Sequence, residues 1–140
     1  MSDAQFERFY WKSLKQMIDG LVESGVTPMI YGEGSLRRRV KYFATLPPGK
    51  CMIHFEDASL DDMRAAKNAL CDVACRSGNV PNLLFSRGTS ADIKDYVKNL
   101  IDICGRDGGY IMDTAALLDD AKPENVRAWF DFTREYGVYR

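Results

Sequence analysis

The chain has 140 residues, of which 46% are hydrophobic and 28% are charged, and its formal net charge is −1. This composition is typical of one soluble globular domain and excludes a disordered or collagen-like chain. A balanced charge with a sequence pI near 5.8 argues against a nucleic-acid partner, because proteins that neutralise a phosphate backbone are normally basic.

The first predicted element is an amphipathic helix over residues 6–22. Its apolar residues recur at steps of three and four, so we expect them to share one helix face in the core. They are Phe6, Phe9, Tyr10, Leu14, Met17, Ile18, Leu21 and Val22. Gly25 marks the end of this helix, and the apolar run at residues 27–31 predicts the first strand.

Three further strand–helix units follow along the chain. Strands are predicted at residues 51–55, 73–75 and 110–112, and helices over residues 36–44, after Ser59 and after Thr89. Ser59 and Thr89 are each followed three residues later by an aspartate, the spacing of a capping box. A short helix is predicted to start at Pro81 and the last helix at Pro123, whose inward residues are expected to be Val126, Trp129, Phe130 and Thr133.

Alternating helices and wholly apolar strands predict an α/β fold with a parallel sheet and helices outside it. Two architectures fit this pattern, an open doubly wound sheet and part of a closed eightfold barrel. A complete barrel needs roughly 200–250 residues, so 140 residues supply about half of one. Short right-handed crossovers predict strands lying in sequential order.

The cysteines and the N-terminal residues bear on the cellular compartment. Cysteines at positions 51, 71, 75 and 104 include no Cys-x-x-Cys pair, and we interpret them as four buried free thiols in a reducing cytoplasm, with a disulfide or zinc cluster as the alternative. The first ten residues contain no apolar signal region. No apolar stretch approaches the roughly 18 residues of a membrane span, so we expect a cytoplasmic protein without a membrane partner.

Five short stretches carry a family resemblance. In chain order they are CRSGNVP at residues 75–81, RGT at 87–89, DGGYI at 107–111, DAKPENV at 120–126 and EYG at 135–137. Together they resemble the C-terminal half of the uroporphyrinogen decarboxylase superfamily, which includes decarboxylases and cobalamin-dependent methyltransferases. The resemblance covers nearly the whole chain. It implies that residues 1–140 are a single half-barrel domain, strands five to eight of a TIM (β/α)8 barrel, and that the N-terminal half is absent.

The sequence departs from both activities of this superfamily. Its zinc-dependent methyltransferases end the fifth strand with His-x-Cys and place a cysteine after the eighth, where this chain has Tyr31-Gly32-Glu33 and Ala115-Ala116. The decarboxylases have a histidine in a Gly-His-Gly turn after the eighth strand, which falls in the same stretch here. Their arginines and catalytic aspartate belong to the missing half. Neither activity therefore transfers residue by residue.

A parallel barrel forms its site at the C-terminal ends of its strands. The residues at those positions are Tyr31, Glu33, His54, Glu56, Ser77, Asn79, Asp113 and Thr114. Glu33 and His54 occupy equivalent points of strands about 4.8 Å apart, so we predict that they bind zinc, which would act as a Lewis acid on a methyl ether or polarise a bound thiol. Some ether-cleaving corrinoid methyltransferases are similar, with a glutamate and histidine site. The alternatives are a hydrogen-bonded His54 and a helix-capping Glu33.

The other site residues are assigned to catalysis or substrate binding. Tyr31 and Asp113 are the catalytic candidates, and Asp113 is either a general acid-base group or a turn residue. Ser77, Gly78 and Asn79 are predicted to bind a phosphate or carboxylate of the substrate, with a tight turn fixed by Asn79 as the alternative. The basic run at residues 37–41 is expected to be mostly solvated, with an anionic substrate tail on one arginine as the alternative.

The function predicted from these features is methyl transfer from a small methylated substrate, with a corrinoid held by a partner protein. A tetrapyrrole decarboxylase-like enzyme and a non-catalytic truncated half-barrel are the alternatives, and the half-barrel alone is expected to be inactive. Because the first and last strands of a half-barrel have unpaired edges, we expect a homodimer or a complex with a separate N-terminal half-barrel.

Overall fold

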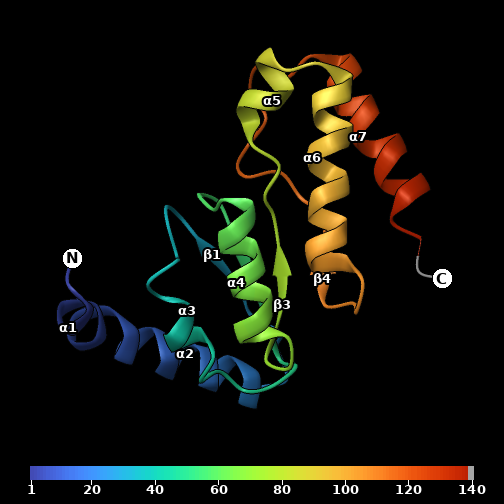
Figure 1. The fold of residues 1–140 in the computed structure, drawn as a ribbon. Helices are drawn as coiled ribbons and strands as arrows, with labels where there is room; N and C mark the ends of the chain where they lie inside the picture. Colours follow the sequence, from blue (N-terminus) through green and yellow to red (C-terminus); the bar gives the residue numbers. More distant parts are fainter. Residues whose placement is uncertain (139–140) are drawn as a thin grey trace.

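Four parallel strands form one sheet in the computed structural model, which describes residues 1–138 (Figure 1). The strands are β1 (Met29–Gly32), β2 (Cys51–Phe55), β3 (Ala74–Ser77) and β4 (Tyr110–Ile111). Their spatial order is β1-β2-β3-β4, and every neighbouring pair is parallel. The predicted parallel sheet and sequential order are confirmed, and this order is compatible with part of a barrel.

Helical segments precede, connect and follow the strands. They are α1 (Asp3–Phe6), η1 (Glu7–Trp11), α2 (Lys12–Glu23), α3 (Val40–Phe43), α4 (Leu60–Leu70), α5 (Asn82–Arg87), α6 (Ser90–Leu100), η2 (Ile101–Gly105) and α7 (Pro123–Tyr136). Capping boxes at Ser59 and Thr89 start α4 and α6 as predicted. The helix predicted over residues 36–44 is shorter, because residues 37–39 form a turn before α3. Among residues 1–138, the helices are too short or too polar to cross a membrane.

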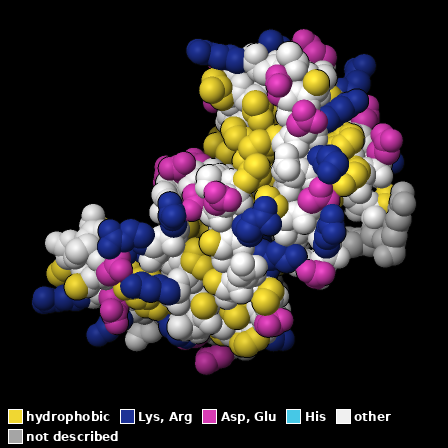
Figure 2. All heavy atoms as spheres, viewed as in Figure 1, with side chains coloured by type: hydrophobic (Ala, Val, Ile, Leu, Met, Phe, Trp, Pro, Cys, Tyr) yellow, Lys and Arg dark blue, Asp and Glu magenta, His cyan; other side chains and the backbone are white. Residues whose placement is uncertain are grey.

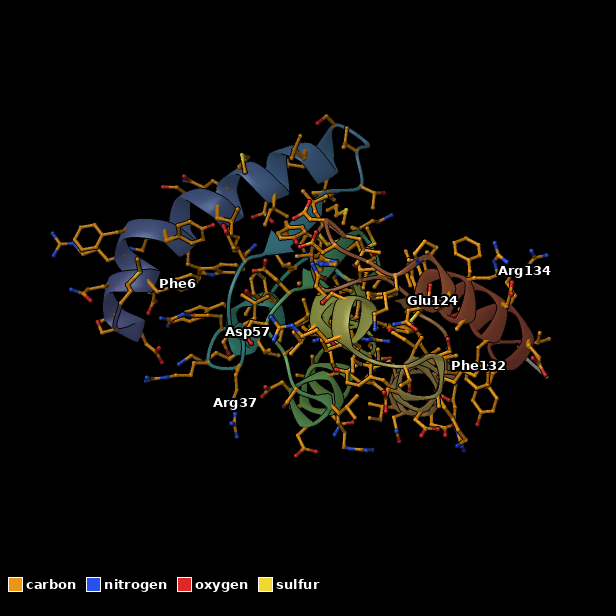
Figure 3. All side chains as sticks on the ribbon, turned by 90° about the horizontal axis from the view of Figure 1, so that it is seen from above. Phe6, Arg37, Asp57, Glu124, Phe132 and Arg134 are labelled. Atoms are coloured by element: carbon orange, nitrogen blue, oxygen red, sulfur yellow. The ribbon has the colours of Figure 1, made fainter. Side chains whose placement is uncertain are left out.

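The sheet has one helix-covered face and one open face. Cys51, Ile53 and Phe55 alternate along β2 on the covered face and are buried. The open face consists of the residues between them and their neighbours in register, Met29, Tyr31, Met52, His54, Cys75, Ser77 and Ile111. Met29, Tyr31 and Ile111 are about half exposed, at 52%, 51% and 48%. In the view from above, α2 (blue), α4 (green) and α7 (red) lie at separate positions around the strands (Figure 3).

The apolar face of the first helix differs from the prediction. Phe6, Trp11 and Ile18 are buried, whereas the predicted core residues Phe9, Tyr10, Met17 and Leu21 are exposed. The reason is the π-helical turn η1, which adds one residue to a turn and shifts the inward positions that follow it. The last helix also differs at one position, since Phe130 is 57% exposed while Trp129 packs edge-on against Phe85.

All four cysteines are free, as predicted, but they are not all buried. Cys51 and Cys104 are buried, Cys75 is partly exposed on the open face, and Cys71 is exposed. Cys71 is exposed because it follows the last residue of α4, Leu70, where the chain leaves the core. Burial raises the pKa of the Cys104 thiol, which keeps it protonated and unreactive.

One carboxylate attaches the N-terminal helix to the basic run. Asp3 accepts hydrogen bonds from the Arg39 guanidinium and from Lys41 Nζ at 2.8 Å, and Arg39 also lies 4.4 Å above the centre of the Phe6 ring. Figure 2 shows basic and acidic side chains mixed at this end of the molecule. Arg37 and Arg38 are exposed, as predicted for most of this run.

Lowering the pH should therefore weaken the attachment of the N-terminal helix to the basic run. The hydrogen bond from Lys41 lowers the pKa of Asp3 below its ordinary 3.8, and the bond from Lys98 lowers that of Asp102. A carboxyl with a lowered folded-state pKa stabilises the fold above its unfolded pKa and loses that effect as the pH falls through the folded value. We expect the urea concentration at the midpoint of unfolding to fall as the pH is lowered from about 4 to about 2. In Asp3→Asn this fall should be smaller. An equal drop in both proteins would contradict this assignment.

Candidate functional site

Side chains from three strands and one loop meet at the C-terminal edge of the sheet. Tyr31, His54 and Ser77 are in register on neighbouring strands, so their side chains project from the same face. Asp113 follows β4 and lies beside His54. We call these four residues the rim cluster. The prediction that Asp113 shares an edge with His54 is confirmed.

His54 is buried and both of its ring nitrogens are hydrogen-bonded. Nδ1 lies 2.9 Å from Ser77 Oγ, and Nε2 lies 3.1 Å from the Ala115 carbonyl oxygen. A carbonyl only accepts hydrogen bonds, so Nε2 carries a proton and donates it to Ala115. Nδ1 pairs with the Ser77 hydroxyl. These two contacts hold the ring in one orientation.

Asp113 faces the same imidazole nitrogen. Its Oδ2 lies 3.5 Å from His54 Nδ1, and its Oδ1 accepts a hydrogen bond from the Thr114 amide at 2.8 Å. The loop is fixed by backbone bonds with Val80, which donates to the Asp113 carbonyl and accepts from the Ala115 amide. The side chain of Asp113 stays 41% exposed, so it is the acidic group of the rim cluster that a ligand can reach.

Tyr31 covers the histidine. Its ring stacks on His54 with centroids 4.5 Å apart, and its hydroxyl donates to the Ala115 carbonyl at 3.2 Å. Desolvation, followed by the nearby carboxylates of Glu56, Asp113 and Glu33, raises the pKa of Tyr31. The phenol therefore remains protonated and acts as a hydrogen-bond donor.

The predicted metal ligands are not assembled into a complete site. Glu33 is exposed, and it does not cap the next helix, which begins at Val40 with Arg39 as its N-cap. The Gly34 amide after it donates instead to Glu56 Oε2 at 2.8 Å. Within residues 1–138, no three or more His, Cys, Asp or Glu side chains are grouped to hold a metal ion. With both His54 nitrogens engaged, the residues as placed do not fit zinc by themselves.

The Ser77-Gly78-Asn79 stretch is buried among protein groups. The Asn79 amide donates to the Ala58 carbonyl, and the Tyr110 hydroxyl donates to the Gly78 carbonyl. Ser77 and Asn79 are each 1% exposed. These contacts describe the tight-turn alternative, in which Asn79 joins the loops that follow β2 and β3. Asn79 Oδ1 is buried without a hydrogen-bond partner among residues 1–138, so one acceptor remains there.

Two buried polar residues were missed by the sequence analysis. Asn125 on α7 donates to the carbonyls of Leu84, Phe85 and Gly88, which joins α7 to α5. Arg76 lies on the covered face of β3 and donates to the Ala74 and Gly108 carbonyls. Asn125 lies in the first turn of a helix and Arg76 in a strand, and no local pattern distinguishes either from a solvated side chain.

A groove lies beside β4, away from the rim cluster. Its volume is about 870 Å³, and its lining includes Tyr110 and Met112 from the end of the sheet, Ile101 from η2, and Phe132 and Tyr136 from α7. We call it the α7 groove. None of the predicted site residues lines it.

Comparison with known proteins gives one match. The family model described as uroporphyrinogen decarboxylase (URO-D) matches residues 1–136. No curated protein matches the chain. The match covers nearly the whole chain, including all four strands of the sheet.

Proposed function

Because the chain belongs to the uroporphyrinogen decarboxylase family, we propose that it forms strands five to eight of a (β/α)8 barrel that transfers a methyl group from a small methylated substrate. The corrinoid that receives the methyl group would be held by a partner protein. Four sequential parallel strands and a match over residues 1–136 support the half-barrel. The free thiols support a reducing cytoplasm as its location.

The apolar side chains of the open face are the observation that favours methyl transfer. In a closed barrel this face would line the interior, and it presents Met29, Met52, Cys75 and Ile111 below the rim cluster. Arg76 is the only cationic residue in the four strands, and it lies buried on the opposite face. An apolar wall suits a small neutral methyl compound, whereas a tetrapyrrole with many carboxylates would have to take its cationic partners from the other half of the barrel.

The rim cluster supplies proton chemistry for such a reaction. When the bond between a methyl group and an oxygen breaks, the leaving oxygen must gain a proton. Tyr31 stays protonated, and Asp113 is exposed beside His54. The Tyr31 hydroxyl would turn from the Ala115 carbonyl to donate a hydrogen bond to the leaving oxygen, and Asp113 would deliver the proton that this oxygen gains. His54 and Ser77 orient these groups through the Ala115 carbonyl and Nδ1. The corrinoid, when bound, supplies the nucleophile that accepts the methyl group.

Zinc at Glu33 and His54 stays a prediction. For zinc to bind there, the hydrogen bond between His54 Nε2 and the Ala115 carbonyl must break. Further zinc ligands must also come from outside the described residues. Metal analysis of the completed barrel tests it. We expect about one zinc per barrel, lost in Glu33→Gln and retained in Glu7→Gln, a matched exposed glutamate. Zinc-free protein, or equal zinc in the two variants, would contradict the prediction.

Activity of the completed barrel tests the proposal. Cob(I)alamin and a panel of methyl ethers, methylamines and methyl thiols serve as probes, and methyl transfer is followed by the absorbance of the corrinoid. We expect Tyr31→Phe and Asp113→Asn to lower the rate by about 10²-fold or more, and Cys71→Ser, a change at an exposed position, to leave it unchanged. Release of carbon dioxide from a porphyrinogen without methyl transfer would favour the decarboxylase-like alternative.

A further inference from the structure

Three sulfur-containing side chains form a row across the open face of the sheet. Met29, Met52 and Cys75 are in register on β1, β2 and β3, and each lies two residues before a member of the rim cluster. Because side chains alternate along a strand, these three project from the same face as the rim cluster and lie one layer below it. We call them the sulfur row.

The sulfur row can be reached from the open side of the sheet. Met29 is 52% exposed, and Met52 and Cys75 are partly exposed, whereas Cys51 is buried on the covered face. Among the described residues, the Cys75 thiol makes one hydrogen bond, a long one of 3.8 Å to the Arg76 carbonyl oxygen. This weak contact leaves the sulfur available to a ligand.

The spacing of the strands allows one ion to contact all three side chains. Neighbouring strands are about 4.8 Å apart, so the row spans two such spacings, about 10 Å, with Met52 in the middle. A methionine side chain is unbranched and turns about three bonds. The sulfurs of Met29 and Met52 can therefore move towards the shorter side chain of Cys75.

These ligand types select a soft metal ion. Thiolate and thioether sulfur suit Cu(I), whereas carboxylate and carbonyl oxygen suit magnesium and calcium. One thiolate and two neutral thioethers form an uncharged complex with Cu(I), but they would leave Zn²⁺ with a net positive charge. Burying a net charge against an apolar face is costly, so the open face favours the monovalent ion.

The surroundings of the sulfur row attract a cation and offer it no competing ligand nearby. Both ring nitrogens of His54 already have hydrogen-bond partners. Glu33 is exposed at the C-terminal edge of the sheet, and the side chain of Asp113 is 41% exposed there. Arg76, the one cationic residue of the four strands, is buried on the opposite face. An approaching positive ion is therefore attracted by carboxylates and meets no cation on this face.

We propose that the sulfur row is a Cu(I) site, with the thiolate of Cys75 and the thioethers of Met52 and Met29 as its ligands. On binding, the S–H bond of Cys75 breaks, its proton passes to the solvent and a Cu–S bond forms, without a change of oxidation state. Cys75 is a free thiol, as this step requires. The site goes beyond the proposed methyl transfer and does not depend on it, because all three ligands belong to this chain.

Competition for Cu(I) between the full chain and the chelator bathocuproine disulfonate, in the absence of oxygen, tests the proposal. Cys71→Ser serves as the parent protein, because Cys71 is exposed and its thiol would bind copper by itself. We expect one Cu(I) per parent chain. Loss of a ligand should cost at least as much affinity as loss of a supporting contact, so Cys75→Ser, Met52→Leu and Met29→Leu should each weaken binding by at least about tenfold.

Met17→Leu is the matched control for Met29→Leu, because Met17 lies on α2 and is 58% exposed. Leucine is close to methionine in volume, so both variants should fold, which circular dichroism verifies. Met17→Leu should bind Cu(I) as the parent does, and so should Glu33→Gln, which changes a predicted zinc ligand. A parent chain without copper would overturn the proposal. So would parent-like affinity in both Met29→Leu and Met52→Leu, because copper would then be held by a thiol alone.

Discussion

Gly78→Ala is expected to lower the free energy of unfolding by about 3 kcal/mol or more, from backbone strain and overlap together. Gly78 has a φ of +106°, a conformation that residues with a Cβ rarely adopt, and a Cβ built there would overlap the Phe55 carbonyl oxygen. That oxygen belongs to backbone in β2 and cannot turn away as a flexible side chain could. The strand end that carries Ser77 must therefore shift, which also displaces the partner of His54 Nδ1.

Urea unfolding monitored by circular dichroism measures the effect, with Gly34→Ala as the matched control. Gly34 has a φ of +71° but no atom within 4 Å of the Cβ position. Gly34→Ala should therefore lower the free energy of unfolding only by the conformational cost, about 1 kcal/mol. Equal losses in the two variants would mean that the close approach to Phe55 contributes nothing.

Asn125→Asp is expected to destabilise the protein by about 3–5 kcal/mol, since it leaves buried acceptors unpaired and adds a buried charge. The Asn125 amide is 1% exposed and donates to the carbonyls of Leu84, Phe85 and Gly88 at 3.2, 3.1 and 2.9 Å. An aspartate has the same shape but no donor when ionised. Its carboxylate would then face the three backbone carbonyls, all of which are acceptors. We expect α7 to separate from α5, which would open the α7 groove.

Asn99→Asp provides the control for the loss of an amide donor. Asn99 is exposed and makes one bond, to the Asp95 carbonyl at 2.8 Å. Water replaces that bond, so the change should be within about 0.5 kcal/mol. Hydrogen exchange of α7 amides separates the two variants, with faster exchange expected only in Asn125→Asp. Unchanged protection in both would show that Asn125 does not hold α7 in place.

Local features of the sequence account for most of the secondary structure. The capping boxes at Ser59 and Thr89 depend on contacts between residues three apart in the chain. Pro123 starts α7 because its ring suits the first turn of a helix. Apolar runs separated by helices also predict parallel strands and their sequential order, since short crossovers leave few other arrangements. The rim positions Tyr31, His54, Ser77 and Asp113 follow from that order.

The tertiary structure alone decided which contacts those residues make. His54 bonds Ala115, 61 residues away, and Asn125 bonds carbonyls 37 to 41 residues away. The π-helical turn η1, which buries Trp11 in place of Phe9 and Tyr10, is equally invisible in the pattern. Caps and periodicity reflect interactions within one or two turns of the chain. The orientation of the His54 ring and the shape of the α7 groove depend instead on how packed segments distant in sequence meet, which neither spacing nor composition encodes locally.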